Sequence, residues 1–513
     1  MQRGWRVGLL VNTVLLAAAA LYFCVAPAAI LARRLADPAL RHPGVPAFTW
    51  GLHRALAPRL QQWAEARVAS GVAGHLNRHV VPDTEWPIFT CVFYLMATEN
   101  LQAEWVKTRP ADDPGAPAVY ARPALDAAVR LVTDPVHHTW VREHWGPDYL
   151  HRENVFFRSL LIAALARYER LTGERRHHAL LVDQAGSLAD ELDRSPAGIL
   201  DDYPQECYPI DVLAAVAWIR DSDDVTGLDH RAFVERAHRA FLPPLTDHGL
   251  PIYRLDQHSF AVLDGSRGTG NSWVLLFAPR LWPEDAQRWC ETYVRHFWQA
   301  RWLCRGFREY ASDAGEPDFG FDVDAGPIIA GFSPAANAFA VAGLRAMGRF
   351  DLAWPISAEV LVSTWPLPHG RLAAASWLSS SQHAPYLGEA ALLSQFTTPP
   401  APGVRLRVGQ GAPPPIVWVG FLLYLGGAAL LLFAARQRWR RNCTAAWEQM
   451  PGLRAQMVVW WALLVAALMA LAAGATWLAF LAVALAQLLP RLTARRCLPR
   501  PIVQAPAINN RMD

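Results

Sequence analysis

The sequence predicts an all-α protein: an (α/α)6 toroid-like extracytoplasmic domain over residues 35–411, flanked by transmembrane helices. Three observations support this. Long, nearly uncharged apolar runs lie at the two ends, the middle shows helical periodicity, and strand-like alternation is almost absent. Hydrophobic residues make up 52% of the 513 positions and charged residues 18%, which suits a globular body with a few membrane spans. The net charge of +3 is too small to indicate a nucleic-acid partner.

An N-terminal transmembrane anchor is predicted over residues 1–34. Residues 7–30 are almost free of charge, with Arg3 and Arg6 before them and Arg33 and Arg34 after. A helix of this length crosses the roughly 30 Å hydrocarbon layer. The small residues at 26–29 also suit a cleaved signal peptide, but the length of the run favours an uncleaved anchor. Either alternative exports the domain that follows.

Residues 412–513 form a predicted C-terminal membrane region with two or three spans. Residues 416–435 are one span, and the arginines that follow it place its end in the cytoplasm by the positive-inside rule. Residues 457–489 are long for one helix and short for two, and Gly474 near the middle favours a hairpin. The main domain is therefore expected on the periplasmic side of the cell inner membrane.

The middle of the chain has the period of helices. Phe157, Leu161, Leu165 and Tyr168 recur at steps of four and three, and Gly173 should end this helix as a left-handed cap. Similar patterns cover residues 50–72, 85–101, 123–132, 176–192, 210–220, 231–241, 284–299, 334–347 and 351–363. Short strand candidates occur only at 252–254 and 260–262. About a dozen helices without a fixed repeat favour a toroid over a superhelical array.

Two loops in the first half of the domain carry candidate functional groups. In residues 81–87, Asp83 either caps the following helix or serves the site. Residues 201–211 contain four carboxylates, two tyrosines and a thiol directly before a helix. Asp211 also suits the helix dipole, whereas Glu206 and Cys207 have no obvious structural role.

Two further loops lie in the second half. The glycines of residues 265–273 do not form a phosphate-binding motif, because no Lys-Ser/Thr follows them. The segment 307–327 is rich in acids, including Glu309 and Asp324, and it lacks the spacing of an EF-hand. Such carboxylates at the mouth of a cavity suit general acid–base chemistry, although a solvated acidic loop is the alternative.

The predicted catalytic residues follow from these loops. Glu206, Asp211, Glu309 and Asp324 are acid–base candidates, Cys207 and Tyr310 are candidate polar orienting groups, and Asp83 is a further candidate. If Glu206 and Glu309 act as a pair, their carboxylates should face each other within about 10 Å. The sequence has no CxxC or HExxH motif, and we expect no cofactor and no metal. Cys290 and Cys304 either pair or remain free thiols.

Three segments resemble the linalool dehydratase/isomerase-type domain. They are Asn154-Val155-Phe156-Phe157 continuing to Tyr168 and Gly173, Gly331-Phe332-Ser333-Pro334 continuing to Gly348, and Arg308-Glu309-Tyr310 before an Asp-rich loop. The resemblance is diffuse and covers residues 80–365. It implies an α/α six-hairpin toroid and cofactor-free addition or removal of water at a terpene alcohol.

The sequence departs from that family at the residues on which the family site depends, two cysteines with an Asp, a Tyr and a His. The corresponding loop contains only Cys207, and the region near Ser159 holds no His. The resemblance therefore supports the fold more directly than the reaction.

Three hypotheses about function remain. The first is a membrane-anchored lyase, hydratase or isomerase acting on an apolar alcohol, which predicts an apolar cavity beside the acidic loops. The second is a glycan-active hydrolase or lyase, which predicts an open groove with two carboxylates about 5–10 Å apart. The third is a non-catalytic envelope protein that binds a partner or a lipid. The sequence does not fix an oligomeric state.

Overall fold

The computed structural model describes residues 2–77, 80–375, 381–444, 453–472, 476–486 and 489. It divides into two compact units, which are considered separately. The terminal unit comprises residues 1–25 and 423–513, and the helical body comprises residues 26–422. Both are mostly helical, which confirms the predicted all-α class at this coarse level.

The terminal unit consists of apolar helices. They are α1 (Gln2–Ala20), the π-helical turn η1 (Leu21–Val25), most of α19 (Pro415–Thr444), α20 (Leu453–Ala472) and α21 (Thr476–Ala486). By length and composition, Leu10–Leu35 and Pro415–Arg440 can each cross a membrane. These two helices support membrane association. Gly474 and the arginines after residue 490 lie outside the described residues.

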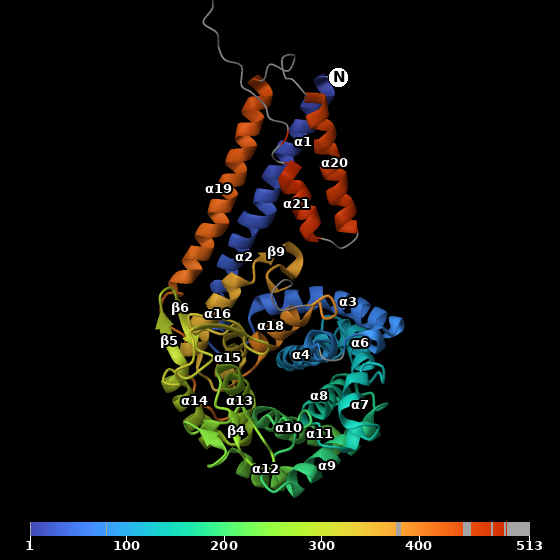
Figure 1. Cartoon of the computed structure of the whole chain (residues 1–513), viewed down its shortest axis with the longest axis vertical. Helices are drawn as coiled ribbons and strands as arrows, with labels where there is room; N and C mark the ends of the chain where they lie inside the picture. The colour runs from blue at the N-terminus through green and yellow to red at the C-terminus, as the bar shows by residue number, and fades with distance from the viewer. Residues whose placement is uncertain are drawn as a thin grey trace, which may run out of the picture. The chain divides into compact units, whose positions relative to one another are not determined.

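Six helices of the helical body contact one another in cyclic order. They are α4 (Val81–Trp105), α8 (Val155–Thr172), α10 (Pro209–Asp221), α13 (Gly268–Leu281), α15 (Pro334–Ala346) and α18 (Leu387–Thr397). Each contacts the next, and α18 contacts α4 (Figure 1). Nearly every residue of α8, α10 and α13 is buried, as expected for helices covered on all sides. We call these six the inner helices.

A second set of helices alternates with the inner helices along the chain. It comprises α3 (Ala47–Ser70), α6 (Arg122–Val132), α9 (His178–Arg194), α12 (Arg231–Ala237), α14 (Pro283–Phe297) and α16 (Phe350–Ser363). Among them α3, α9, α12 and α14 bury mainly one face, whereas α6 and α16 are buried more widely. In α14, for example, Ala286, Trp289, Cys290, Tyr293 and Phe297 are buried at steps of three and four. Each flanking helix precedes one inner helix in the sequence.

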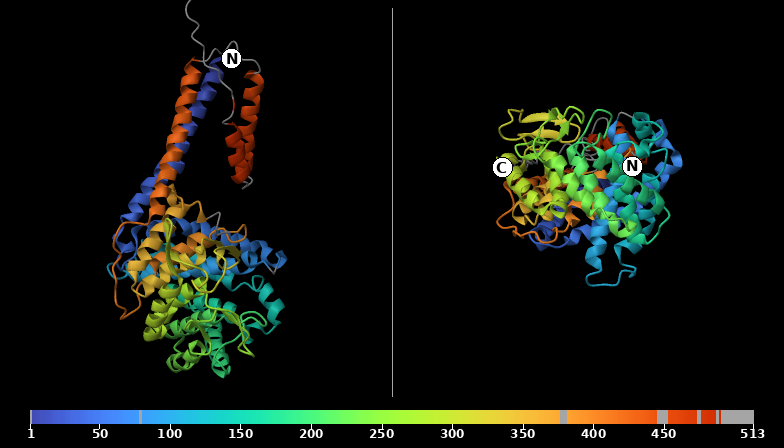
Figure 2. Two further views of the ribbon diagram at one scale, coloured as in Figure 1. Left: turned by 60° about the vertical axis from the view of Figure 1, so that its left-hand side comes forward. Right: turned by 90° about the horizontal axis from the view of Figure 1, so that it is seen from below.

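Shorter helices complete the body. They are α2 (Ala26–Leu35), η2 (Pro38–Leu40), η3 (Val72–His75), α5 (Pro117–Tyr120), α7 (Thr139–Trp145), η4 (Tyr149–His151), α11 (Asp223–Thr226), η5 (His238–Phe241) and η6 (Pro368–Gly370). Both views of Figure 2 show helices throughout this body.

Five two-stranded antiparallel ribbons lie between the helices of the body. They pair β1 (Thr246–Asp247) with β2 (Leu250–Pro251), β3 (Arg254–Leu255) with β4 (Val262–Asp264), β5 (Trp298–Arg301) with β6 (Cys304–Phe307), β7 (Phe319–Asp322) with β8 (Gly326–Ile329), and β9 (Pro366–Leu367) with β10 (Arg371–Leu372). The yellow strands of residues 298–329 lie at one edge of the body (Figure 2, right). The sequence predicted only the β3–β4 region, and the helix expected through Gln299 ends at Phe297.

Two local features can be compared with the sequence. Gly173 adopts a φ of 72° and its N–H donates to the carbonyl of Glu169, which confirms the predicted left-handed cap of α8. Cys290 and Cys304 are both free thiols rather than a disulfide.

The close approach of α13 and α15 is expected to depend on Gly343. A Cβ at this position would lie 2.7 Å from the backbone oxygen of Ser272, which cannot move without shifting α13. We expect Gly343→Ala to lower the free energy of unfolding by about 1–3 kcal/mol. Thermal unfolding of the full chain in detergent measures this. The control is Gly186→Ala in α9, where a Cβ meets nothing within 4 Å, so stability should stay the same or rise. Equal stability of the Gly343→Ala variant and the wild type would contradict the expected close packing.

Candidate active site

Carboxyl groups gather where the inner helices begin. Glu85 lies near the N-terminal end of α4, Asp211 lies in the first turn of α10, and Asp202 belongs to the loop before α10. Asp324 lies in the turn between β7 and β8, ahead of α15. The interactions among these four groups, which we call the carboxyl cluster, appear in the pKa shifts described next.

Glu85 is the most strongly perturbed of the half-buried acids. Its Oε1 accepts a hydrogen bond from the hydroxyl of Tyr203. Burial raises the pKa of Glu85 to about 8, the Tyr203 hydrogen bond lowers it, and the nearby Asp324 and Asp211 raise it further. Glu85 therefore holds a proton at neutral pH and can act as an acid.

The charge of Asp324 affects the titration of Asp211. Burial and then the charge of Asp324 raise the pKa of Asp211 to about 7, while hydrogen bonding from the Trp273 side chain lowers it. Desolvation by the surrounding protein raises the pKa of Asp324, although this residue keeps access to solvent. Its Oδ2 accepts a hydrogen bond from the Tyr253 hydroxyl at 2.7 Å. One of these acids can lose its proton near neutral pH, which is the property of a general base.

The turn that carries Asp324 is fixed by its own backbone. Asp322 Oδ1 accepts hydrogen bonds from the N–H groups of Asp324 at 2.8 Å and Ala325 at 3.1 Å. Gly326 follows with a φ of 73°, which a glycine adopts without strain. This hairpin geometry brings Asp324 to the cluster from a segment more than a hundred residues away from Asp211.

Asp202 is the deepest member of the carboxyl cluster. It is only 2% exposed, and its Oδ2 accepts a hydrogen bond from the N–H of Tyr208 at 3.0 Å. Its Oδ1 makes no hydrogen bond to another described residue. Burial and then the charge of Asp211 raise the pKa of Asp202 well above its ordinary value. Burial therefore favours the protonated form of each of these four acids.

An aromatic floor of five rings adjoins the carboxyl cluster. It is formed by Phe89, Phe93, Phe156, Trp273 and Phe339, with centroids 5.2 Å apart for Phe89–Phe156 and for Trp273–Phe339, and 6.2 Å apart for Phe93–Phe339. Phe89 follows Glu85 by four residues on α4 and so shares its face. Phe89 and Phe339 are half-buried and Phe93 is buried. The carboxyl groups of the cluster thus lie next to an apolar surface.

Glu309 and Arg267 form a buried ion pair beside this cluster. Arg267 Nε donates to Glu309 Oε1 at 2.9 Å, and the hydroxyl of Thr269 donates to Oε2 at 2.7 Å. Glu309 is fully buried, and burial raises its pKa against the opposing effect of Arg267. The guanidinium also lies 4.5 Å from the ring centroid of Tyr253 and 5.4 Å from that of Tyr310. Glu309 and Tyr310 therefore both lie against the guanidinium of Arg267.

The other candidate residues lie at the rim or outside the cluster. Glu206 has a side chain that is 43% exposed, accepts a hydrogen bond from the Tyr208 hydroxyl at 2.8 Å, and lies 3.7 Å from Arg254. No hydrogen bond or ion pair between described residues joins it to Glu309. Cys207 is buried, its backbone pairs with Leu255, and burial raises the pKa of its thiol. Asp83 lies in the first turn of α4, where its backbone oxygen accepts from Arg67 at 2.8 Å.

Of the candidates predicted from sequence, the structure brings Asp211 and Asp324 together. Other residues of the site were not among those predicted from the sequence: Glu85, Asp202, Tyr203, Tyr253 and Trp273. Glu85, Asp202 and Trp273 lie within segments that the sequence singled out, namely residues 81–87, 201–211 and 265–273. The sequence therefore indicated the right segments but not these residues. The pairing of Tyr203 with Glu85 across 118 positions has no local signature.

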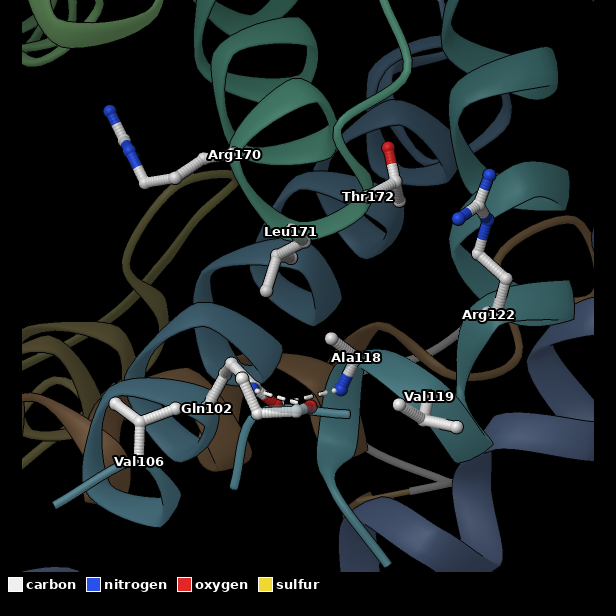
Figure 3. A pocket seen from close by; sticks show the side chains of 9 residues that line it. Gln102, Val106, Ala118, Val119, Arg122, Arg170, Leu171 and Thr172 are labelled. Carbon is white, nitrogen blue, oxygen red and sulfur yellow. Dashed lines mark hydrogen bonds between the residues drawn. The ribbon is translucent and has the colours of Figure 1, made fainter. Parts of the chain in front are cut away.

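A separate pocket of about 560 Å³ lies at the other end of α4 (Figure 3). Gln102, Val106, Ala118 and Leu171 line it, and Gln102 Oε1 accepts a hydrogen bond from the N–H of Ala118 at 3.0 Å. Its two arginines, Arg122 and Arg170, are held in ion pairs with acidic neighbours. Gln102 is 17 residues beyond Glu85, or about 25 Å along the helix. The pocket and the carboxyl cluster are therefore distinct places.

No protein-family model matches the chain. The similarity to the linalool dehydratase/isomerase-type domain accordingly stays a prediction from the sequence.

The raised pKa of Glu85 predicts a pH-dependent stability. The ordinary pKa of a glutamate is about 4.3, so between about pH 4.3 and 8 the folded state keeps a proton that the unfolded state releases. Stability should therefore fall as the pH rises through this window. Glu85→Gln removes the titrating group, and we expect its melting temperature to fall less than that of the wild type between pH 5 and 8. The exposed Glu235→Gln is the control, and it should keep the wild-type slope. The same slope in the Glu85→Gln variant would show that Glu85 is ionised in the folded state.

Proposed function

We propose that the helical body is an α/α six-hairpin toroid and that the carboxyl cluster is its active site. In this proposal the enzyme carries out cofactor-free acid–base lyase, hydratase or isomerase chemistry on an apolar alcohol. One observation carries the proposal: carboxyl groups with raised pKa values, two of them hydrogen-bonded to tyrosine hydroxyls, adjoin an aromatic floor where the inner helices begin.

The cyclic contacts of the inner helices support the toroid. Six flanking helices alternate with six inner helices along the chain, and the last inner helix contacts the first. Successive flanking–inner pairs then form six hairpins. Because every inner helix follows its flanking helix, the inner helices run in the same direction, and their N-terminal ends share one end of the ring. This is where Glu85 and Asp211 lie.

The proposed reaction assigns a role to each acid. Glu85 donates its proton to the hydroxyl of the substrate while the C–O bond breaks, and water leaves with the bonding electron pair. An ionised Asp211 or Asp324 removes a proton from the adjacent carbon, and the electrons of that C–H bond form the C=C bond. The products are an alkene and water, and hydration is the reverse. Aromatic faces such as those of Phe89 and Phe339 stabilise positive charge that develops on carbon.

The hydroxyl groups of two tyrosines orient the acids by hydrogen bonding. Tyr203 donates to Glu85, and Tyr253 donates to Asp324. A hydroxyl donor fixes the direction of a carboxyl group, so that its other oxygen is presented to the substrate. The floor is made mostly of phenylalanines, which have no polar atoms to bind sugar hydroxyls. This favours an apolar substrate over the glycan alternative.

The test of function uses the full chain in detergent, an allylic tertiary alcohol and water enriched in ¹⁸O. We expect ¹⁸O to enter the alcohol and alkene to form, both detected by mass spectrometry. Glu85→Gln and Asp211→Asn should each lower the rate by about 10²–10⁴-fold while the melting temperature shows that the variants are folded. Asp83→Asn is the control, because residues two positions apart on a helix do not share a face, and it should keep its activity.

The alternatives give different results in the same experiment. Release of reducing ends from a glycan, lost in the same two variants, would replace the alcohol by a sugar. Wild-type rates in both variants would contradict the assignment of the site. Absence of turnover on both substrate classes would favour the third hypothesis, a binding protein.

We further propose that the helical body faces the periplasm and that the inner membrane holds the apolar ends. The support is the pair of helices long enough to span and the arginines Arg436, Arg438 and Arg440 near the end of α19. A reporter that works only outside the cytoplasm should be active when fused after residue 411. A reporter that is fluorescent only inside should work when fused after residue 444. The opposite pattern would reverse the orientation.

A further inference from the structure

Two histidines and an aspartate outside the carboxyl cluster converge from three separate segments. His248 lies in the turn between β1 and β2, His296 lies in the last turn of α14, and Asp313 lies in the loop after β6. The ligand atoms that these residues offer all lie within 4.8 Å of one another. We propose that His248, His296 and Asp313 form a Zn²⁺ site.

The spacing of the polar atoms supports a cation between them. His248 Nε2 lies 3.8 Å from Asp313 Oδ1, and His296 Nδ1 lies 3.8 Å from Asp313 Oδ2. Direct hydrogen bonds would be about 2.7–3.2 Å long. Bonds of about 2.0–2.2 Å to a tetrahedral Zn²⁺ place two ligand atoms roughly 3.3–3.5 Å apart. These distances are too long for hydrogen bonds. The three ligand atoms lie within 4.8 Å of one another, so the side chains would have to approach by up to roughly 1.4 Å to close around zinc.

The imidazoles are available as ligands. Neither imidazole makes a hydrogen bond to another described residue, and the two ring centroids lie 4.8 Å apart. Their side chains are 30% and 23% exposed, so an ion can enter from solvent and a water molecule can complete its coordination. Two histidines and a carboxylate are a donor set that suits Zn²⁺.

A second carboxylate adds negative charge and a potential fourth ligand. Asp247 Oδ1 lies 3.7 Å from His248 Nε2. Its other oxygen, Oδ2, accepts a hydrogen bond from the N–H of Ser266 at 2.8 Å, which fixes the carboxylate in place. Oδ1 thus remains on the side of the histidine.

Backbone conformation and hydrogen bonding position the segments that carry the three side chains. His248 and Gly249 have φ values of 52° and 76°, which matches a two-residue turn with both central residues in the left-handed region. This conformation is uncommon for a residue other than glycine, and histidine is among those that adopt it more often. The carbonyl of His296 accepts a hydrogen bond from the N–H of Ser312 at 2.9 Å, which ties the loop of Asp313 to the end of α14.

A zinc ion here would join segments that are 65 positions apart in the sequence, from His248 to Asp313. Asp247 links this site to Ser266, the residue before Arg267 of the buried ion pair. Bound metal would therefore stiffen the segment that presents Arg267 to Glu309. This role is structural and is independent of the proposed reaction.

The test uses the full chain in detergent, purified without a polyhistidine tag, stripped with a chelator and titrated with Zn²⁺ alone. Calorimetry should show one site per chain, and thermal unfolding should show a melting temperature that rises with Zn²⁺ concentration. His248→Ala and His296→Ala should each weaken binding by at least about 10-fold, by analogy with the cost of disturbing a metal site. The exposed His258→Ala is the matched control and should bind as the wild type does.

Two outcomes would overturn the proposal. The first is a wild-type protein that binds Zn²⁺ no more tightly than the double variant His248→Ala/His296→Ala. The second is an equal loss of binding in His258→Ala. Metal-free melting temperatures of all variants establish that any loss of binding does not come from failure to fold. Asp313→Asn provides a second measure, because it keeps the size of the side chain and removes the charged ligand.

Discussion

The guanidinium of Arg267 holds together the segments on which the carboxyl cluster depends. It is 4% exposed and faces three carboxylates, those of Glu309, Asp264 and Asp322. It also lies over Tyr253, the hydrogen-bond donor to Asp324. Removal of one partner from a buried ion pair typically costs about 3–5 kcal/mol, because it leaves an uncompensated charge. The geometry of Asp324 and Tyr253 is therefore coupled to an interaction that never contacts substrate in the proposed reaction.

Two effects compete at the N-terminal ends of the inner helices. The helix dipole stabilises negative charge there by at most about 2 kcal/mol and thus favours ionised acids. Burial costs a lone carboxylate several kcal/mol and favours the protonated form. The pKa values of Glu85, Asp211 and Asp202 are all raised, with burial as the largest cause, so desolvation outweighs the dipole. Acids at helix starts are usually stabilising surface features, but here they hold protons.

The sequence predicted the features that depend on neighbouring residues. The period of residues 154–172 and the glycine after them define α8 and its cap without knowledge of the rest of the fold. The four acid-rich or glycine-rich loops were identified as the places where polar chemistry is concentrated. Asp211 and Asp324 could be selected because each belongs to an acid-rich segment of the sequence, around the start of α10 and in the β7–β8 turn respectively.

The partners of these residues could not be predicted in the same way. Glu309 and Arg267 are 42 positions apart, and their pairing depends on how the segment after β6 meets the start of α13, where the backbone of Arg267 pairs with that of Tyr310. A buried salt bridge and a catalytic acid have the same sequence signal, namely a glutamate in a loop, and only burial and partners distinguish them. The β5–β6 and β7–β8 hairpins were missed because each of their strands is only four residues long, which is too short to establish a period.

The carboxyl cluster contributes unfavourably to the free energy of folding, and the fold does not require it for stability. Asp202 keeps a buried oxygen without a hydrogen bond, and a lost partner of this kind costs about 1–3 kcal/mol. Replacement of such groups by apolar residues is often neutral or stabilising. By contrast, the ion pair of Glu309 has its charge and its hydrogen bonds satisfied. The fold thus satisfies one buried acid, Glu309, and leaves an oxygen of Asp202 without a hydrogen bond to another described residue, beside other acids with raised pKa values. Perturbed titratable groups of this kind occur mostly at functional sites, which is why the cluster, and not Glu309, is the better candidate for chemistry.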